Sequence, residues 1–139
     1  MMDSLATLFS VIVTILAIIF VFYTGIVVAR MRGKHGVRAP ATTGHAEFDC
    51  AYRVQMNTLE QFVMFLPLLW LATIYFHMLP LLPGALGLIW VVGRIVYMQG
   101  YMAAPEKRSL GFGITFFATA GLLILAIIGV VQAWMALSA

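Results

Sequence analysis

The chain has 139 residues, of which 63% are hydrophobic and only 9% are charged. A soluble domain carries roughly 25% charged residues, so the composition excludes an ordinary soluble domain and favours a protein whose main solvent is lipid. The formal net charge is +3 at pH 7, but the chain has no basic domain outside its apolar runs, so we expect no nucleic-acid partner. The chain has one cysteine, Cys50, so it cannot form an intrachain disulfide.

Four long apolar runs predict four membrane-spanning helices. We expect a single membrane domain over residues 1–139, with spans at about 5–29, 57–79, 82–104 and 110–137 and cytoplasmic loops at 30–52 and 105–109. The first run is uncharged and follows an acidic segment, so we interpret it as a helix that ends at Ala29–Arg30 and not as a signal peptide. The predicted fold class is an all-α, integral membrane four-helix bundle.

The positive charges predict how the bundle is oriented. Lys and Arg residues gather in or beside the first and third loops, whereas the second loop, HMLPLLPG, has none. By the positive-inside rule, both termini of this multi-pass protein face the non-cytoplasmic side. The tails are short and show no ER-retention signal, so we expect a bacterial inner membrane in preference to the ER.

The start of the second helix carries a polar stripe. In the segment YRVQMNTLEQ, Arg53, Asn57 and Glu60 are spaced at i, i+4 and i+7. At ~100° per residue this spacing places all three on one face of a helix. Charged groups near a bilayer are costly and therefore need a partner or a ligand.

A second stripe lies on the third helix, where Arg94, Tyr97 and Tyr101 are spaced at i, i+3 and i+7. The second helix enters the membrane at the cytoplasmic side and the third leaves it there, so facing stripes would form a polar pocket. Alternatively, Arg94 and Glu60 form a buried ion pair that locks the bundle, with the tyrosines in an interfacial belt.

The residue types in these stripes suit a small peptide-like ligand. Arginine binds carboxylates with a bidentate fork, Glu60 can accept an ammonium group, and Asn57 and Gln55 can bind amides. A ligand with free carboxylates, amides and an α-amino group matches this set, and glutathione is such a molecule.

The segments EFDCAYRVQMNTLEQF, GRIVYMQGY and KRSLGFG, together with TTG at 42–44, carry a recognisable pattern. An acidic-Phe start is followed by R-x-Q-x-N-x-x-E and then by R-x-x-Y-x-Q-G-Y. This pattern resembles the MAPEG family of membrane-associated proteins in eicosanoid and glutathione metabolism, in its microsomal glutathione transferase and leukotriene C4 synthase branch. The resemblance implies a homotrimer that holds glutathione at subunit interfaces near the cytoplasmic side.

The resemblance also implies roles for individual residues. Arg108 matches the arginine that activates the glutathione thiol, and whether Arg30 or Arg32 closes over the peptide is open. Gln61 stands where eicosanoid-type members carry Tyr, which argues against a dedicated leukotriene synthase. With Arg94 from the stripe of the third helix, the expected glutathione-binding residues are Arg30, Arg53, Gln55, Asn57, Glu60, Arg94, Tyr97 and Tyr101.

The implied function is a glutathione-dependent transferase or peroxidase acting on lipophilic electrophiles or lipid hydroperoxides in the membrane. On the charge pattern alone Arg108 is better interpreted as a positive-inside anchor, and the resemblance reverses this, because a guanidinium at Arg108 would favour the thiolate. The alternative function is a non-catalytic lipid-binding or scaffolding protein of the same fold. No metal site is expected, because the three histidines have no partners at metal-ligand spacing.

Overall fold

The structure, a computed structural model, describes residues 2–138 apart from the side chain of Asp3. Its helices are α1 (Met2–His35), α2 (Ala46–Tyr75), α3 (Leu82–Ala103), the short 3₁₀ helix η1 (Pro105–Arg108) and α4 (Ser109–Ser138). Residues 2–138 contain no strand. All four α-helices are long and apolar enough to cross a membrane, which confirms the predicted all-α class with four candidate spans.

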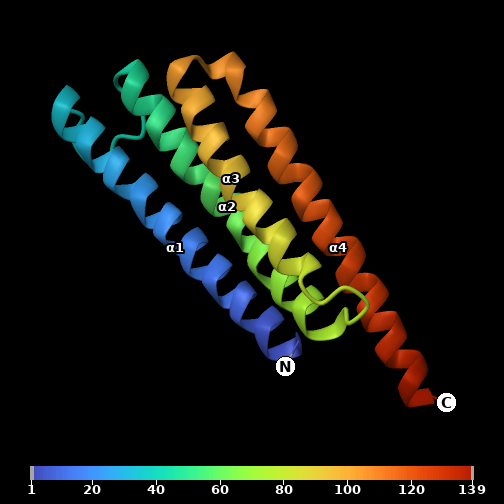
Figure 1. The fold of residues 1–139 in the computed structure, drawn as a ribbon. Coiled ribbons are helices and arrows are strands. Elements are labelled where there is room, and N and C mark those ends of the chain that lie inside the picture. Colours follow the sequence, from blue (N-terminus) through green and yellow to red (C-terminus); the bar gives the residue numbers. More distant parts are fainter. Residues whose placement is uncertain (1, 139) are drawn as a thin grey trace.

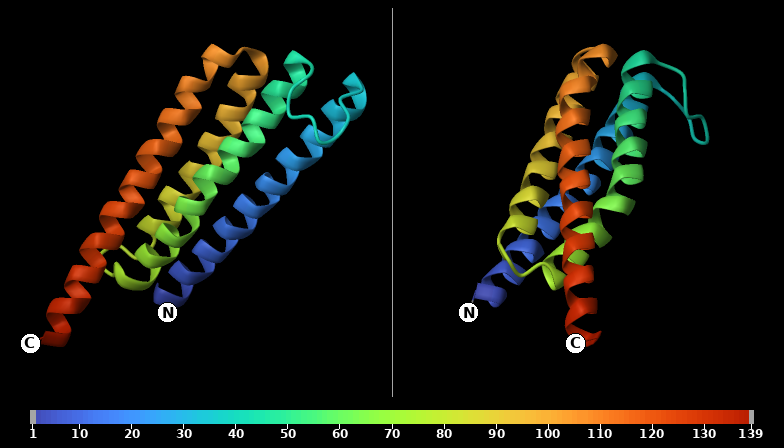
Figure 2. Two further views of the ribbon diagram at one scale, coloured as in Figure 1. Left: turned by 180° about the vertical axis from the view of Figure 1, so that it is seen from behind. Right: turned by 90° about the vertical axis from the view of Figure 1, so that its right-hand side faces the viewer.

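The four helices run side by side in alternating directions (Figure 1). The central pair, α2 and α3, packs together, and α1 and α4 each pack against both of them from opposite edges of the bundle. Both termini lie at the same end as the α2–α3 turn (Figures 1 and 2). The opposite end holds the α1–α2 loop and η1, and we call it the basic end because every Lys and Arg except Arg94 belongs to its segments 30–53 and 105–108.

The bundle interior is built from aromatic and aliphatic side chains of all four helices. Trp90 stacks on Phe65 with ring centroids 4.0 Å apart and planes 7° apart, and both side chains are fully buried. The outer surface is also apolar: Phe22, Phe117 and Trp134 are each more than 70% exposed. An apolar surface around an already apolar interior is what a lipid-solvated bundle requires.

Small residues bring α3 and α4 close together beside Tyr97. A Cβ atom placed on Gly111 would clash with the backbone nitrogen and Cα of Tyr97. Glycine at this position therefore lets the first turns of α4 approach the backbone of α3. The register of α4, and hence of η1 before it, depends on this contact.

The first helix is longer than predicted. It does not end at Ala29–Arg30 but continues to His35, and Gly36, at φ +64°, follows its last residue. A left-handed glycine is a common helix terminator. The guanidinium of Arg32 donates to the carbonyl oxygens of Val37 and Ala41, at 3.3 and 3.0 Å, and so fastens the loop back onto the helix end.

The other connections differ from expectation in smaller ways. Because α2 already begins at Ala46, the expected loop over 30–52 narrows to residues 36–45. At its far end α2 stops at Tyr75, before residue 79, and the Phe76 amide closes its last turn by donating to the Ala72 carbonyl. Pro83 lies in the first turn of α3, where a missing backbone N–H is tolerated.

Candidate functional site

Seven side chains in the half of the bundle nearest the basic end form one connected series of contacts, which we call the polar chain. Three come from α2, three from α3 and one from η1, so the series joins both halves of the bundle. Its members are Arg53, Asn57, Glu60, Arg94, Tyr97, Tyr101 and Arg108.

The α2 part of the polar chain carries both signs of charge. Arg53 Nη1 lies 3.7 Å from Glu60 Oε1, and the two side chains are 57% and 50% exposed. Asn57 Nδ2 donates to the other carboxylate oxygen of Glu60 at 3.2 Å. All three side chains share one face of the helix, as the i, i+4, i+7 spacing predicted. Both charges of the pair remain accessible to a ligand.

Arg94, on α3, contacts this stripe from the interior of the bundle. Its side chain is completely buried, and its Nη2 donates to Asn57 Oδ1 at 3.1 Å and to Thr58 Oγ1 at 2.8 Å. Asn57 therefore accepts from Arg94 with its oxygen while its nitrogen donates to Glu60. These two bonds fix the orientation of the Asn57 amide.

The alternative of a buried Arg94–Glu60 ion pair is wrong: among the described residues, Glu60 pairs with Arg53, and Arg94 binds Asn57 and Thr58. The role of Thr58 was not anticipated from the sequence. The sequence feature that could have indicated this role is a hydroxyl-bearing residue directly after Asn57, at the point where α2 otherwise turns from polar to apolar residues.

Arg94 has donor capacity left over. Its Nε and Nη1 atoms are buried without a hydrogen-bond partner in the described part of the chain. The face of its guanidinium lies over the Tyr97 ring, 4.0 Å from the centroid, an attractive cation–π arrangement. The three N–H groups on these two nitrogens are an observation in favour of a buried water molecule binding next to Asn57.

The α3 end of the polar chain leads to Arg108. Tyr97 and Tyr101 meet edge to face with centroids 5.6 Å apart, and the Arg108 guanidinium carbon lies 5.5 Å from the Tyr101 centroid. Arg108 is exposed at the end of η1. Gly100 permits this placement, because a Cβ atom there would lie 2.5 Å from the Lys107 carbonyl oxygen. The short helix can thus fold against α3 and bring Arg108 to the tyrosines.

The remaining expected residues lie on the α1 side of the bundle: Arg30 belongs to α1, and Gln55 of α2 points toward α1. The Gln55 amide nitrogen approaches Gly25, where an added Cβ would lie 3.2 Å away. Arg30 lines a groove between α1 and α3. Arg32 instead binds the loop carbonyls and lies over the Phe48 ring, 4.6 Å from its centroid. Of the two arginines left open by the sequence, Arg30 is thus the one that faces a groove.

An apolar groove of about 790 Å³ lies between α2 and α4, and none of the polar-chain residues lines it. The end of the groove nearest the basic end is lined by Gln61, which directly follows Glu60, and by Phe112, four residues after Arg108. Deeper in the bundle the groove is purely apolar except for Thr119. Its lining residues are Gln61, Met64, Pro67, Leu68, Leu71, Phe112, Phe116, Thr119, Ala120 and Leu123.

A bundle of four apolar helices with a charged site at one end defines a multi-pass membrane protein. The particular family follows from comparison with known sequences. The sequence model of the MAPEG family matches residues 10–128, and the chain belongs to this family. The resemblance that the two sequence motifs carried is confirmed.

Individual relatives fall in the expected branch. The chain is 37% identical over 108 residues to microsomal glutathione S-transferase 2 of Mus musculus, covering 78% of this chain and 72% of the relative. It is 38% identical over 111 residues to leukotriene C4 synthase of Cavia porcellus, covering 78% and 69%. An uncharacterized protein of Synechocystis sp. is 42% identical over 123 residues, or 88% of both chains.

Proposed function

We propose that this protein is a glutathione-dependent membrane transferase that also reduces lipid hydroperoxides. The observation that carries the proposal is the polar chain, which joins a half-exposed Arg53–Glu60 pair to Arg108. Gln61, the residue after Glu60, lines an apolar groove between α2 and α4. Relatives named as glutathione transferase and leukotriene C4 synthase support the same chemistry. A water-soluble thiol and a membrane-dissolved electrophile can meet at such a boundary.

The α2 stripe would bind the peptide part of glutathione. Arg53 pairs with a carboxylate, Glu60 accepts the α-ammonium group, and the Asn57 amide binds a backbone amide or carboxylate oxygen. Arg94 is completely buried, so we propose that it orients the Asn57 amide from the bundle interior and does not contact the ligand itself. Tyr97 and Tyr101 line the site between this stripe and Arg108.

Arg108 would stabilise the thiolate. A free thiol has a pKa of ~8.5, so only a few per cent is ionised at neutral pH. A guanidinium next to the sulfur favours the anion, and lowering the thiol pKa by ~2 units corresponds to about 2.7 kcal/mol of differential interaction. Arginine stays protonated at neutral pH, so Arg108 acts as a fixed positive charge and not as a base.

The thiolate then attacks an electrophile held in the α2–α4 groove. In conjugation, sulfur forms a bond to carbon while a halide leaves or an activated alkene takes up a proton from solvent. In peroxide reduction, the thiolate sulfur bonds to one peroxide oxygen and the O–O bond breaks, so glutathione is oxidised to its sulfenic acid and the alkoxide takes a proton from solvent to leave as an alcohol. A second glutathione then completes the reaction to disulfide and water. Holding thiolate and electrophile side by side supplies much of the rate gain.

A complete site would be shared between copies in a homotrimer. Arg30 and Gln55 lie on the α1 side of the bundle, away from the contacts of the polar chain. They reach a glutathione molecule on the polar chain only if another copy presents them. We also propose that the basic end faces the cytoplasm, with both termini on the other side of a bacterial inner membrane.

Turnover with an aryl halide and with an organic hydroperoxide tests the function. Purified protein in detergent should consume glutathione with both substrates, and Arg108→Ala should lose about 25-fold in rate, because a thiol pKa of ~6.5 in place of ~8.5 raises the thiolate fraction at pH 7 from about 3% to about 76%. Lys107→Ala is the matched control, because it removes the neighbouring charge, and it should keep its rate. Glutathione binding without turnover in the wild type would favour the non-catalytic lipid-binding alternative.

A further inference from the structure

Polar atoms interrupt the apolar groove between α2 and α4 at one depth. Both helices run away from the basic end (Figure 1), and Gln61 and Phe112 line the groove nearest that end. Along α2, Pro67 lies six residues beyond Gln61, about 9 Å at 1.5 Å per residue. Along α4, Thr119 lies seven residues beyond Phe112, about 10.5 Å. Pro67 and Thr119 therefore line the groove at nearly the same depth.

Pro67 leaves a backbone carbonyl without its helical donor. Proline has no amide hydrogen, so the Val63 carbonyl oxygen does not receive the i→i+4 hydrogen bond that an α-helix otherwise provides. The proline ring occupies the place of the missing hydrogen, so the freed oxygen lies beside the ring that lines the groove. In a membrane such an oxygen needs a donor from a neighbouring helix, a water molecule or a ligand.

The hydroxyl on the facing helix does not supply this donor. Thr119 Oγ1 donates to the Thr115 carbonyl oxygen of its own helix at 2.8 Å. A hydroxyl has one hydrogen to donate and two lone pairs, so Thr119 offers the groove acceptor sites only. We call the Val63 carbonyl oxygen and the Thr119 hydroxyl oxygen the acceptor pair.

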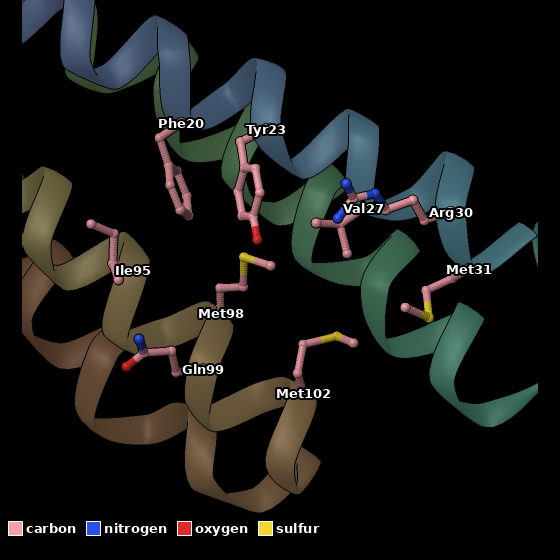
Figure 3. Close-up of a pocket in the computed structure, with 9 residues that line it drawn as sticks. All are labelled: Phe20, Tyr23, Val27, Arg30, Met31, Ile95, Met98, Gln99 and Met102. Carbon is pink, nitrogen blue, oxygen red and sulfur yellow. The ribbon is translucent and has the colours of Figure 1, made fainter. Parts of the chain in front are cut away.

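The groove between α1 and α3, of about 590 Å³, has a different character. Figure 3 shows the Tyr23 hydroxyl and the Gln99 amide among its lining side chains, together with the Arg30 guanidinium. All three groups can donate hydrogen bonds. The two grooves therefore differ in the polar ligand groups that they suit, because the interior of the α2–α4 groove offers acceptors alone.

A neutral hydroxyl group on an apolar chain fits the acceptor pair. Its O–H can donate to the Val63 carbonyl oxygen, while the rest of the chain contacts leucines such as Leu71 and Leu123. A charged donor fits less well, because no acidic side chain lines the groove among the described residues and an unpaired charge within a span is costly. A site with an unsatisfied acceptor also discriminates against a chain that lacks the hydroxyl.

We propose that the α2–α4 groove selects electrophiles whose apolar chain carries a hydroxyl group about 9–11 Å from the reacting atom. The reacting group lies at the end lined by Gln61 and Phe112, and the hydroxyl donates to the acceptor pair. Pro67 and Thr119 are then the residues that determine this specificity. The substrate class rests on the proposed function, whereas the preference of the groove for a hydroxyl can be measured without turnover.

Calorimetric binding of two isomeric straight-chain diols to the purified protein in detergent tests the acceptor pair. One diol carries its hydroxyls on adjacent carbons, and the other carries them about 9–11 Å apart along the extended chain. The wild type should bind the second diol about fivefold more tightly, the factor that one net hydrogen bond provides. The isomers have the same composition, so added polarity does not explain a difference. Equal affinities would overturn the proposal.

Two substitutions remove the acceptor pair. Pro67→Ala restores an N–H for the Val63 carbonyl oxygen, and Thr119→Val replaces the hydroxyl with a methyl group. Each should reduce the preference for the widely spaced diol, and the double variant should abolish it. Thr14→Val is the matched control, because the Thr14 hydroxyl makes the same kind of bond, to the Ser10 carbonyl oxygen at 2.8 Å, outside the groove. A preference that persists in a double variant shown to be folded by thermal unfolding would contradict the proposal.

Turnover with glutathione distinguishes this proposal from the proposed function. Straight-chain hydroperoxides with and without a hydroxyl at the same spacing serve as substrates, and the hydroxylated one should have about a fivefold lower KM. Turnover of both hydroperoxides with equal KM would contradict the hydroxyl selection alone. A diol preference without any turnover would contradict the proposed function and still support the acceptor pair as a hydroxyl-binding site.

Discussion

The inner helices α2 and α3 differ from the outer helices α1 and α4 in where they carry polarity. Each inner helix packs against the three other α-helices, whereas α1 and α4 pack mainly against that central pair. Six of the seven polar-chain residues lie on α2 and α3, and the spans of α1 and α4 carry no Lys, Arg, Asp or Glu between Ser4 and Ala29 or between Ser109 and Ser138.

This difference shows how the bundle accommodates charge in lipid. Arg94 is tolerated because it is fully buried, with a hydrogen-bonded partner on α2 and an aromatic ring on its own helix. These contacts offset part of the cost of burying the charge, while the Nε and Nη1 atoms of Arg94 have no partner among the described residues. Most of the exposed large apolar side chains of the described residues lie on the outer helices, with Phe22, Phe117 and Trp134 among the most exposed.

The largest effect should come from breaking the contact between an inner and an outer helix. Gly111→Ala places a methyl group against the backbone of Tyr97, and overpacking of this kind costs about 1–3 kcal/mol or more. We expect a lower melting temperature in detergent and loss of glutathione binding, because Tyr97 and η1 shift together.

Gly113→Ala is the matched control for this substitution. A Cβ atom at Gly113 meets nothing within 4 Å, and alanine is favoured over glycine in a helix by about 1 kcal/mol. Its melting temperature should stay the same or rise. Equal losses in the two variants would mean that the close approach of α3 and α4 is not what positions the site.

Removing the charge of Glu60 should have the next largest effect. Glu60→Gln keeps the size of the side chain and its hydrogen bond from Asn57 but loses the negative charge for the ligand ammonium group. A hydrogen bond to a charged group contributes about 1.5–3 kcal/mol, so glutathione affinity by calorimetry should fall about 10- to 100-fold. Unchanged affinity would return the Arg53–Glu60 pair to a structural role.

Replacing Arg94 distinguishes a role in stabilising the bundle from a role in orienting Asn57 for the ligand. Arg94→Met has a similar volume, and apolar replacement of a buried charge is often neutral for stability. The melting temperature should therefore change little, while KM for glutathione rises about tenfold through the loss of one charge-assisted hydrogen bond to Asn57. A large drop in melting temperature with unchanged KM would show that Arg94 serves the bundle alone.

The smallest effect concerns the two arginines near the end of α1. Arg30→Ala should weaken glutathione binding by about fivefold, in line with one partly exposed charge contact of about 1 kcal/mol. Arg32→Ala should leave affinity unchanged and instead increase hydrogen exchange in residues 36–45, because Arg32 holds the carbonyls of Val37 and Ala41. The opposite pattern would assign the closing role to Arg32.

Periodicity made the polar stripes predictable, because residues three, four and seven apart share a helix face whatever the helix packs against. It could not tell that Glu60 pairs with Arg53 on its own helix while Arg94 reaches Asn57 and Thr58, since those partners depend on how α2 and α3 are rotated against each other. The spacing within each stripe is compatible with an Arg94–Glu60 ion pair and equally with the Arg53–Glu60 pair that the structure has.

Helix ends and close approaches were harder to anticipate. The basic run after Ala29 suggested a loop, yet it is helical because Arg32 fastens the following loop to the helix and Gly36 ends it. Gly111 and Gly113 look alike in the sequence, and only the packing of α4 on α3 shows that one of them is required. Such features depend on three-dimensional neighbours that a local pattern does not contain.

The central claim is that Arg108 stabilises a glutathione thiolate at the end of the polar chain. Its most direct test is a titration of the purified protein with glutathione at neutral pH, followed by the ultraviolet absorbance of the thiolate, for wild type and Arg108→Ala in parallel. We predict a thiolate signal in the wild type that is lost in Arg108→Ala, while calorimetry shows that both bind glutathione. A wild-type protein that binds glutathione without a thiolate signal, or a signal that persists in Arg108→Ala, would contradict the claim.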